Sequence, residues 1–297
     1  MTISPVEQKI RAGLPLIRFL QDFLPLSLLN RLNQVGVAKA KLEAGVVRKA
    51  VSAEGVSCEW LIPPNCRMDK VLLYFHGGGF IFEQTPLHLA MGAYLAKKLG
   101  VRILMVDYPT APSQPYPAAL NACSAAYLWL LGQGVSARDI VVAGDSAGGN
   151  LAIATLLKLR GENHPLPAAA ICLSPVTDLT PEAHRSEGIR DLLLSPKALK
   201  RYNQAYLAGN DPHNPLISPV LGDLRGLPPM LIFAGDEEVL REDAIHFAKK
   251  AVAAGLDIRL EIYPRMWHVW QLFLSLPEAT QSLDDMAQFC AAQLALD

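Results

Sequence analysis

The feature that most constrains this chain is the sequence Gly-Asp-Ser-Ala-Gly at residues 144–148. An apolar, strand-like run at residues 139–143 precedes it, and a helix-like run at residues 150–159 follows it. Serine and glycine are moderate to poor helix formers, so packing alone does not favour this pattern. A serine between glycines at a strand-to-helix junction is typical of a sharp, strained turn that exposes a nucleophilic hydroxyl. A serine that merely caps the helix is the alternative interpretation.

Apolar runs alternate with helix-like runs along most of the chain. Eight runs have the composition of strands, at residues 45–51, 56–63, 70–75, 101–108, 139–144, 168–174, 229–235 and 257–264. Helix-like segments lie near residues 87–99, 117–132, 146–159, 241–254 and 277–294. This order predicts an α/β fold with a mostly parallel eight-stranded sheet covered by helices on both faces. The first two runs are closer together and more polar, which predicts an antiparallel hairpin at one edge.

Composition excludes several classes of protein. The 297 residues are 51% hydrophobic, enough for a large core, and the net charge of −1 gives no reason to expect a nucleic-acid partner. No apolar run reaches the roughly 18 residues of a membrane-spanning helix, so we expect no stable membrane insertion. Five cysteines without a Cys-x-x-Cys pair argue against a metal site or a disulfide framework and fit a cytoplasmic location. We expect Cys123 and Cys172 to be buried thiols.

Two segments stand outside the strand–helix alternation. Residues 1–40 are predicted to form N-terminal cap helices that cover apolar surface, and their mixed charges argue against membrane-surface binding. Residues 41–297 are predicted to form the catalytic domain. Within it, residues 178–228 form a long connection with one helix-like stretch at residues 195–207. A connection of that length inside a compact domain is usually functional, so we interpret it as a cap insertion.

A second motif, His-Gly-Gly-Gly-Phe, ends the strand-like run that precedes residue 76. Glycines leave backbone N–H groups free to point into a site, where they can bind the oxyanion of a tetrahedral intermediate. We predict that the N–H groups of Gly78, Gly79 and Ala147 form this oxyanion hole, and that Gly77 shapes the turn. His76 is predicted to be a structural hydrogen-bonding residue.

A nucleophilic serine needs a base and an acid. In the order serine, acid, histidine, the base must follow Ser146. The histidines that meet this condition are His164, His184, His213, His246 and His268. His268 follows the last predicted strand, where such a base belongs, and is our prediction. The acid should follow the seventh strand, where spacing alone leaves open Asp236, Glu237 and Glu238, with Glu242 and Asp243 more remote.

Together these motifs resemble the bacterial hormone-sensitive-lipase-like (family IV) carboxylesterases of the α/β-hydrolase superfamily. The resemblance covers residues 40 to 297 and includes Gly-Asp-Ser-Ala-Gly-Gly-Asn-Leu-Ala and Met-Trp-His-Val-Trp. It implies Ser146 as nucleophile and His268 as base. It also implies Glu238 as acid, in an acid-x-Leu pattern, with Asp236 as the runner-up. The chain departs from the family at Pro109, where an arginine is usual, and this puts the packing of that loop in doubt.

The predicted reaction is hydrolysis of short-chain acyl esters through an acyl-enzyme, with no cofactor or metal. Gly77, Phe80 and Trp267 are predicted to line a restricted apolar substrate pocket, and Trp270 to belong to the core. A lactone hydrolase or a deacetylase would use the same residues, and a non-catalytic ligand receptor on this fold is a third alternative. The last strand-like run, residues 257–264, could pair across a two-fold axis in a homodimer.

Overall fold

All eight predicted strands form in the computed structural model, which describes residues 4–33, 42–183, 188, 189 and 191–296. The strands are β1 (Val47–Ala53), β2 (Val56–Ile62), β3 (Arg67–Phe75), β4 (Val101–Asp107), β5 (Ile140–Asp145), β6 (Ala169–Leu173), β7 (Met230–Gly235) and β8 (Ile258–Tyr263). They form one sheet in the order β1-β2-β4-β3-β5-β6-β7-β8. The pairs β1–β2 and β2–β4 are antiparallel and the other pairs are parallel, which confirms the predicted fold class and edge hairpin.

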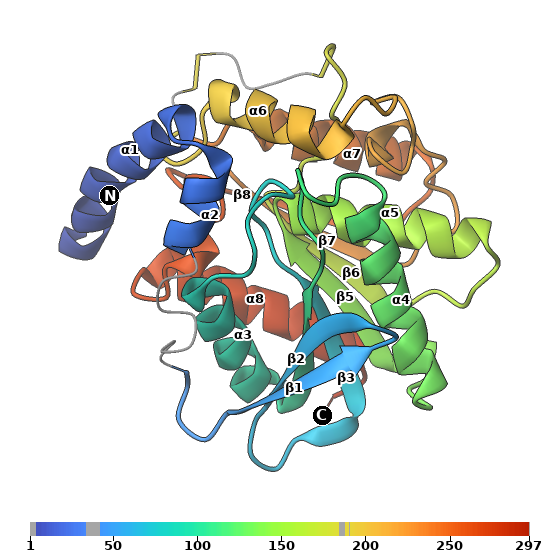
Figure 1. The fold of residues 1–297 in the computed structure, drawn as a ribbon. Helices are drawn as coiled ribbons and strands as arrows, with labels where there is room; N and C mark the ends of the chain where they lie inside the picture. The colour runs from blue at the N-terminus through green and yellow to red at the C-terminus, as the bar shows by residue number, and fades with distance from the viewer. Residues whose placement is uncertain (1–3, 34–41, 184–187, 190, 297) are drawn as a thin grey trace.

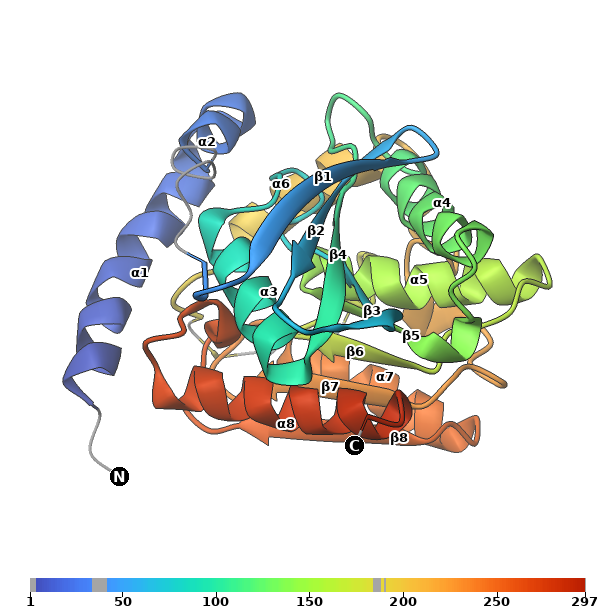
Figure 2. The same cartoon turned by 90° about the horizontal axis from the view of Figure 1, so that it is seen from below.

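Helices cover both faces of the sheet. They are α1 (Pro5–Phe23), α2 (Leu26–Asn33), α3 (Pro86–Leu99), α4 (Ala118–Gly132), α5 (Ala147–Gly161), α6 (Pro196–Leu207), α7 (Arg241–Ala253) and α8 (Pro277–Gln293), with short 3₁₀ turns η2 (Ala137–Asp139), η3 (Pro219–Leu221) and η4 (Trp270–Leu272). One core packs α3 and α8 against the sheet, and the other packs α4, α5 and α7 (Figures 1 and 2). No helix in the described ranges is long and apolar enough to cross a membrane.

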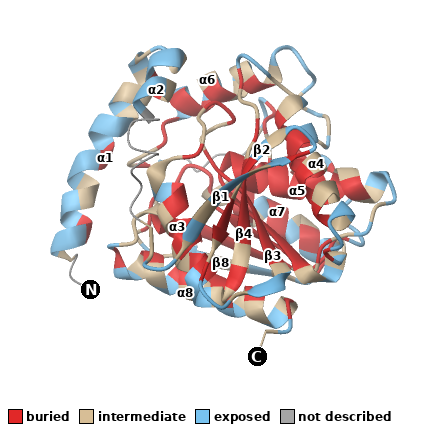
Figure 3. Cartoon of the chain, turned by 60° about the horizontal axis from the view of Figure 1, so that its bottom comes forward, coloured by how far each residue is buried: buried red, intermediate tan, exposed pale blue. Residues whose placement is uncertain are grey.

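The central strands are apolar at almost every position because both of their faces are buried. In β3, Leu73 and Phe75 contribute to the core on the α5 side, whereas Leu72 and Tyr74 contribute to the core on the α8 side. Figure 3 shows this burial along the middle of the sheet. Successive residues of a strand point to opposite faces, so a strand covered on both sides must be apolar throughout.

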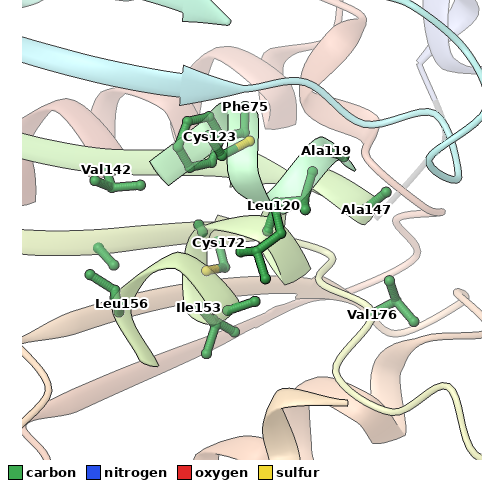
Figure 4. Close-up of a cluster of buried hydrophobic side chains, with 14 of the residues drawn as sticks. Phe75, Ala119, Leu120, Cys123, Val142, Ala147, Ile153, Leu156, Cys172 and Val176 are labelled. Atoms are coloured by element: carbon green, nitrogen blue, oxygen red, sulfur yellow. The ribbon is translucent and has the colours of Figure 1, made fainter. Parts of the chain in front are cut away.

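The core behind the Gly-Asp-Ser-Ala-Gly motif joins β3, β5 and β6 to α4 and α5. Phe75, Val142 and Leu156 are buried there with Cys123 and Cys172 (Figure 4). The prediction that these two cysteines are buried thiols is confirmed. Burial raises the pKa of the Cys172 thiol to about 12, so it stays protonated and unreactive at neutral pH.

Helix α1 only partly fulfils the expectation that it covers apolar surface. Leu14 is buried in the core, but Leu16 and Phe23 are 63% and 60% exposed. The other buried residue of the helix is Glu7, which forms ion pairs with Arg11 and Arg265. The charged face of α1 thus lies against the protein and much of its apolar face points outward. Of the predicted cap segment at residues 1–40, residues 1–3 and 34–40 lie outside the described residues.

The predicted cap insertion lies between β6 and β7. Its helix-like stretch forms α6, beside α1 at the end of the molecule where the parallel strands end (Figure 1). The hydroxyl of Ser195 caps α6 by accepting a hydrogen bond of 2.9 Å from the N–H of Ala198. Residues 184–187 and 190 of the insertion lie outside the described residues. The helices α1 and α6 therefore stand over the carboxyl ends of β5 to β8.

Candidate active site

The turn between β5 and α5 is sharply bent at Ser146, whose φ of 53° and ψ of −115° are rare for a residue with a side chain. Neighbouring backbone leaves no room for side chains on the flanking glycines. A Cβ on Gly148 would lie 1.9 Å from the carbonyl oxygen of Phe75, and one on Gly144 would lie 2.4 Å from Gly148. The N–H of Ser146 donates to the carbonyl of Leu173, 2.8 Å away. The glycines thus permit the strained turn, and the turn presents the serine hydroxyl.

His268 lies in the loop after β8 and reaches this hydroxyl. Its Nε2 is 2.9 Å from Oγ of Ser146, and the two residues are only 5% and 8% exposed. Its Nδ1 is 3.7 Å from Oε2 of the fully buried Glu238, a separation typical of an ion pair. Burial alone would lower the pKa of His268, but the negative charge of Glu238, with smaller contributions from Asp191 and Asp145, raises it above its ordinary value.

The three consecutive carboxylates after β7 have three different surroundings. Asp236 accepts a hydrogen bond from the N–H of Arg265 in the neighbouring loop. Glu237 points outward to Arg11 of α1, with an N–O distance of 2.5 Å. Glu238 alone of the three turns inward to the imidazole. The structure therefore brings Glu238 to the base and gives the runner-up, Asp236, a place in a turn.

Two further residues that the motifs did not reveal hold the acid loop. The hydroxyl of Ser174, directly after β6, donates to Oε2 of Glu238 over 2.6 Å and accepts from the N–H of Val269 over 3.2 Å. The buried carboxylate of Asp191 accepts from the N–H of Val239 over 3.0 Å. Ser174 could have been suspected from its position at a strand end. Asp191 lies in the cap insertion, where no sequence pattern marks it.

The predicted oxyanion loop faces the serine. Gly78 and Gly79 have φ angles of 121° and 61°, which glycine adopts without strain. No hydrogen bond within the described part of the chain occupies their N–H groups or that of Ala147, the first residue of α5. The N–H of Gly77 is instead used internally, because it donates to Oδ1 of Asp145 over 2.9 Å. Three backbone donors thus remain for a ligand, as predicted for Gly78, Gly79 and Ala147.

Asp145 connects the nucleophile turn to the oxyanion loop, a role that the motif analysis missed. Besides the N–H of Gly77, its carboxylate accepts from the hydroxyl of Tyr74 over 2.8 Å and lies 3.3 Å from Nε2 of His88. Burial would raise the pKa of Asp145, but His88 and these hydrogen bonds hold it below its ordinary value. The carboxylate is therefore a buried anion that fixes Gly77 next to Ser146.

The other histidines have different surroundings where the structure describes them. His76 is buried and stacked on Tyr108 at 4.2 Å, and burial with the nearby His88 lowers its pKa to about 4. This agrees with the structural role that we predicted for it. His164 and His213 lie near surface carboxylates. His246 belongs to α7, and His184 lies outside the described residues.

A cavity of about 440 Å³ opens above Ser146 and His268. It is mostly apolar, and its walls come from α1, the oxyanion loop, α6 and the loop after β8. They include Ile17, Gln21, Gly77, Gly78, Gly79, Phe80, Phe82, Leu87, Leu193, Leu199, Tyr202, Asn203, Val269, Leu272 and Phe273. Gly77 and Phe80 line it as predicted. Trp267 does not: it is fully buried in the core beside Phe273, so this prediction was wrong. Among the described residues, no group of three metal-binding side chains occurs.

Comparison with known proteins agrees with this arrangement. A family model described as the alpha/beta hydrolase fold matches residues 72–272. An acetyl-hydrolase of Streptomyces hygroscopicus is 41% identical over 237 residues, which cover 78% of this chain and 79% of that protein. An esterase of Acinetobacter venetianus is 38% identical over 232 residues, 77% of this chain and 76% of that protein. The crystal structure of an esterase from the bacterial hormone-sensitive lipase family superposes with a TM-score of 0.90 at 34% identity, covering 99% of this chain and all of that one.

Proposed function

The chain belongs to the α/β-hydrolase-fold family, in its bacterial hormone-sensitive-lipase branch, and on this premise we propose that it is a serine carboxylesterase acting on short-chain acyl esters. The observation that carries the proposal is the hydrogen bond of 2.9 Å between His268 and Ser146 at a cavity wall. A strained serine, a histidine within hydrogen-bond distance of it and a buried carboxylate beside the histidine are the elements of nucleophilic acyl transfer.

In the first half-reaction, Oγ of Ser146 attacks the ester carbonyl carbon while Nε2 of His268 takes the hydroxyl proton. The carbonyl oxygen becomes an oxyanion, and the N–H groups of Gly78, Gly79 and Ala147 donate to it. The charge of Glu238 stabilises the imidazolium. When the tetrahedral intermediate collapses, the bond to the alcohol oxygen breaks and His268 gives its proton to the leaving alcohol.

In the second half-reaction, a water molecule takes the place of the alcohol. His268 removes a proton from the water, whose oxygen attacks the acyl carbon of the acyl-enzyme. The same backbone donors hold the second oxyanion. Collapse breaks the bond to Oγ, the serine regains its proton from the imidazolium, and the carboxylic acid leaves. Apart from the ester and this water molecule, every group that takes part belongs to the side chains and backbone of this chain.

The preference for short acyl chains is supported by the cavity. At about 440 Å³ it is in the lower part of the range for small-molecule sites, and the rings of Phe80, Phe82, Tyr202 and Phe273 limit it. The similarity to a protein named acetyl-hydrolase supports acetyl esters, so deacetylation is the variant of this function with the most support. A lactone is a cyclic ester and would follow the same steps.

The test is hydrolysis of p-nitrophenyl acetate, butyrate, octanoate and palmitate by the wild type and by Ser146→Ala. We expect turnover that is fastest for acetate or butyrate and that falls at least about 10⁴-fold in the variant. A folded wild type that hydrolyses none of the four esters would contradict the proposal and favour a ligand receptor. Preference for palmitate would contradict the short-chain assignment alone.

We also propose a cytoplasmic homodimer in which β8 pairs with its partner across a two-fold axis. Strand β8 is an edge of the sheet, where Ile258 and Leu260 are only partly buried and Ile262 is exposed. Exposed edges favour strand pairing between copies. Light scattering after size exclusion should give twice the monomer mass of 32.3 kDa. A mass equal to the monomer would contradict the pairing.

A further inference from the structure

The oxyanion loop holds an unusual backbone conformation. Three consecutive residues, Gly78, Gly79 and Phe80, have φ angles of 121°, 61° and 63°. Glycine adopts such angles freely, but a phenylalanine in the left-handed region is strained. Strained residues of this kind persist only where the surrounding structure holds them. The question is therefore which part of the molecule holds Phe80 and the glycines in place.

Two tyrosines of the cap helix α6 contact this loop from outside. The ring of Tyr206 stacks on Phe80 with centroids 3.8 Å apart and planes 8° apart. The ring of Tyr202 lies against Gly79 so closely that a Cβ on the glycine would be 2.5 Å from its Cδ2. The same ring meets Phe82 edge-on at 5.4 Å. The two tyrosines are four residues apart, so they lie on one face of α6.

The contacts are made by the rings and not by the hydroxyls. Both tyrosines are buried, and both hydroxyl oxygens lack a hydrogen-bond partner within the described residues. Buried polar groups are normally paired, so a hydroxyl without a partner contributes nothing favourable here. Phenylalanine should therefore replace either tyrosine without loss of the contact.

We propose that Tyr202 and Tyr206 are positioning residues that hold the oxyanion loop in its donor geometry, so that the hole is complete only while α6 is docked. This inference rests on the proposed function, because it assigns a role in the same reaction. Tyr206 acts indirectly, because it stacks on Phe80, which lines the cavity, but does not line the cavity itself. Its effect on the reaction must pass through the loop.

The attachments of α6 extend this coupling to α1. Nη2 of Arg201 donates to the carbonyl of Leu24 over 2.7 Å, and the hydroxyl of Ser195 donates to the carboxylate of Asp22. Arg201, directly before Tyr202, and Ser195, at the start of α6, thus hold the end of α1 over the cavity. A displacement of α6 that widens the cavity would also remove the support of Gly79 and Phe80. Closing the cap and completing the oxyanion hole are then one event.

The test compares Tyr206→Leu with Tyr206→Phe. Loss of one oxyanion-hole N–H group lowers kcat by about 10²- to 10³-fold. An N–H group that is present but poorly positioned should have a smaller effect, so we expect kcat for p-nitrophenyl acetate to fall about 10- to 100-fold in Tyr206→Leu with little change in KM. Tyr206→Phe should restore wild-type kcat. A trifluoromethyl ketone, which forms an oxyanion on the serine, should bind Tyr206→Leu about 10- to 100-fold more weakly than the wild type.

A matched control separates positioning from general loss of stability. Tyr127 of α4 is buried and its hydroxyl donates to Pro165, away from the oxyanion loop. Tyr127→Leu should lower the melting temperature but leave kcat and the binding of the ketone unchanged. Unchanged kcat and ketone binding in a folded Tyr206→Leu would overturn the inference while leaving the esterase assignment intact. A wild type without esterase activity would instead contradict the proposed function.

Discussion

The nucleophile turn and the cap meet at the same cavity but are held in place by different forces. At the turn, backbone approaches backbone: the carbonyl of Phe75 lies where a side chain on Gly148 would have to be. In the cap, side chains reach backbone carbonyls near the surface. Arg18 of α1 donates to the carbonyl of Asp191 over 2.6 Å, and Arg201 of α6 donates to the end of α1. The nucleophile turn therefore has no room for an added side chain, whereas the hydrogen bonds of the cap can break locally.

This difference assigns separate tasks to the two regions. The turn must keep Ser146 in a strained conformation, and a rigid, close-packed interior can do that. The cap must admit a substrate, and its helix α1, in which only Glu7 and Leu14 are buried, can open at low cost. The strained serine and the entrance to the cavity are thus held by different parts of the chain. Substitutions at the turn should therefore affect esterase activity and the free energy of unfolding, whereas substitutions in the cap should affect local opening.

The largest effect is expected for Gly148→Ala at the turn. The new Cβ would lie 1.9 Å from the carbonyl oxygen of Phe75 and 2.6 Å from that of His76, and backbone cannot move away as a flexible side chain can. We expect a loss of about 3 kcal/mol or more in the free energy of unfolding and no measurable esterase activity. Urea denaturation and p-nitrophenyl acetate hydrolysis would measure both.

The last residue of the same helix provides the control. A Cβ on Gly161 meets nothing within 4 Å, so Gly161→Ala should change the free energy of unfolding by less than about 1 kcal/mol and leave activity unchanged. Equal stability of the two alanine variants would refute the idea that close backbone contact fixes the turn.

The next effect concerns Glu238, the proposed acid. Glu238→Gln removes the charge that faces His268, and we expect kcat to fall about 10²- to 10⁴-fold. Asp236→Asn keeps an oxygen that can accept from the N–H of Arg265, so its kcat should stay within about threefold of the wild type. Steady-state kinetics on the two variants measures the contrast. The reverse result would make Asp236 the acid.

A smaller effect should appear in the pH dependence. The base must be neutral to accept the proton, so activity is lost as pH falls through the pKa of His268. Because Glu238 raises that pKa, the acid limb of kcat/KM should lie above about 6.5, the ordinary value for histidine. In Glu238→Gln the residual activity should have its limb at a lower pH. A limb below 6 in the wild type would contradict the proposed ion pair.

The sequence also predicted the hydrolase body and its nucleophile turn better than the contacts of the cap. The central strands are recognisable because burial on both faces leaves a near-continuous apolar pattern, and the edge hairpin because its two strands are more polar and close together. Ser146 and the glycines are recognisable because only glycine fits the close approaches around them. The order of residues along the chain left five histidines, and the position after the last strand singled out His268, which lies 2.9 Å from Ser146 in the structure.

What the sequence could not reveal depends on contacts between distant segments. Spacing could not choose among three adjacent carboxylates, since the choice depends on Arg11 and Arg265 drawing two of them away. Trp267 was assigned to the pocket from its nearness to the base, but its side chain turns into the core. The inward-facing charges of α1 were also unpredictable, because a helix whose charged face packs against the protein has the same periodicity as one that packs its apolar face.

The smallest effect is expected in the cap, from Arg201→Ala. This change removes the hydrogen bonds from its guanidinium to the carbonyls of Gln21 and Leu24, worth about 1–2 kcal/mol, at a place where the loss can be confined to α1. We expect faster amide hydrogen exchange in residues 16–24, no change in α5, and kcat within about threefold of the wild type. Lys200→Ala, at an exposed neighbouring position of α6, should leave exchange unchanged. Faster exchange in α5 together with α1 would mean that the cap and the nucleophile turn unfold as one unit, and the contrast between them would fail.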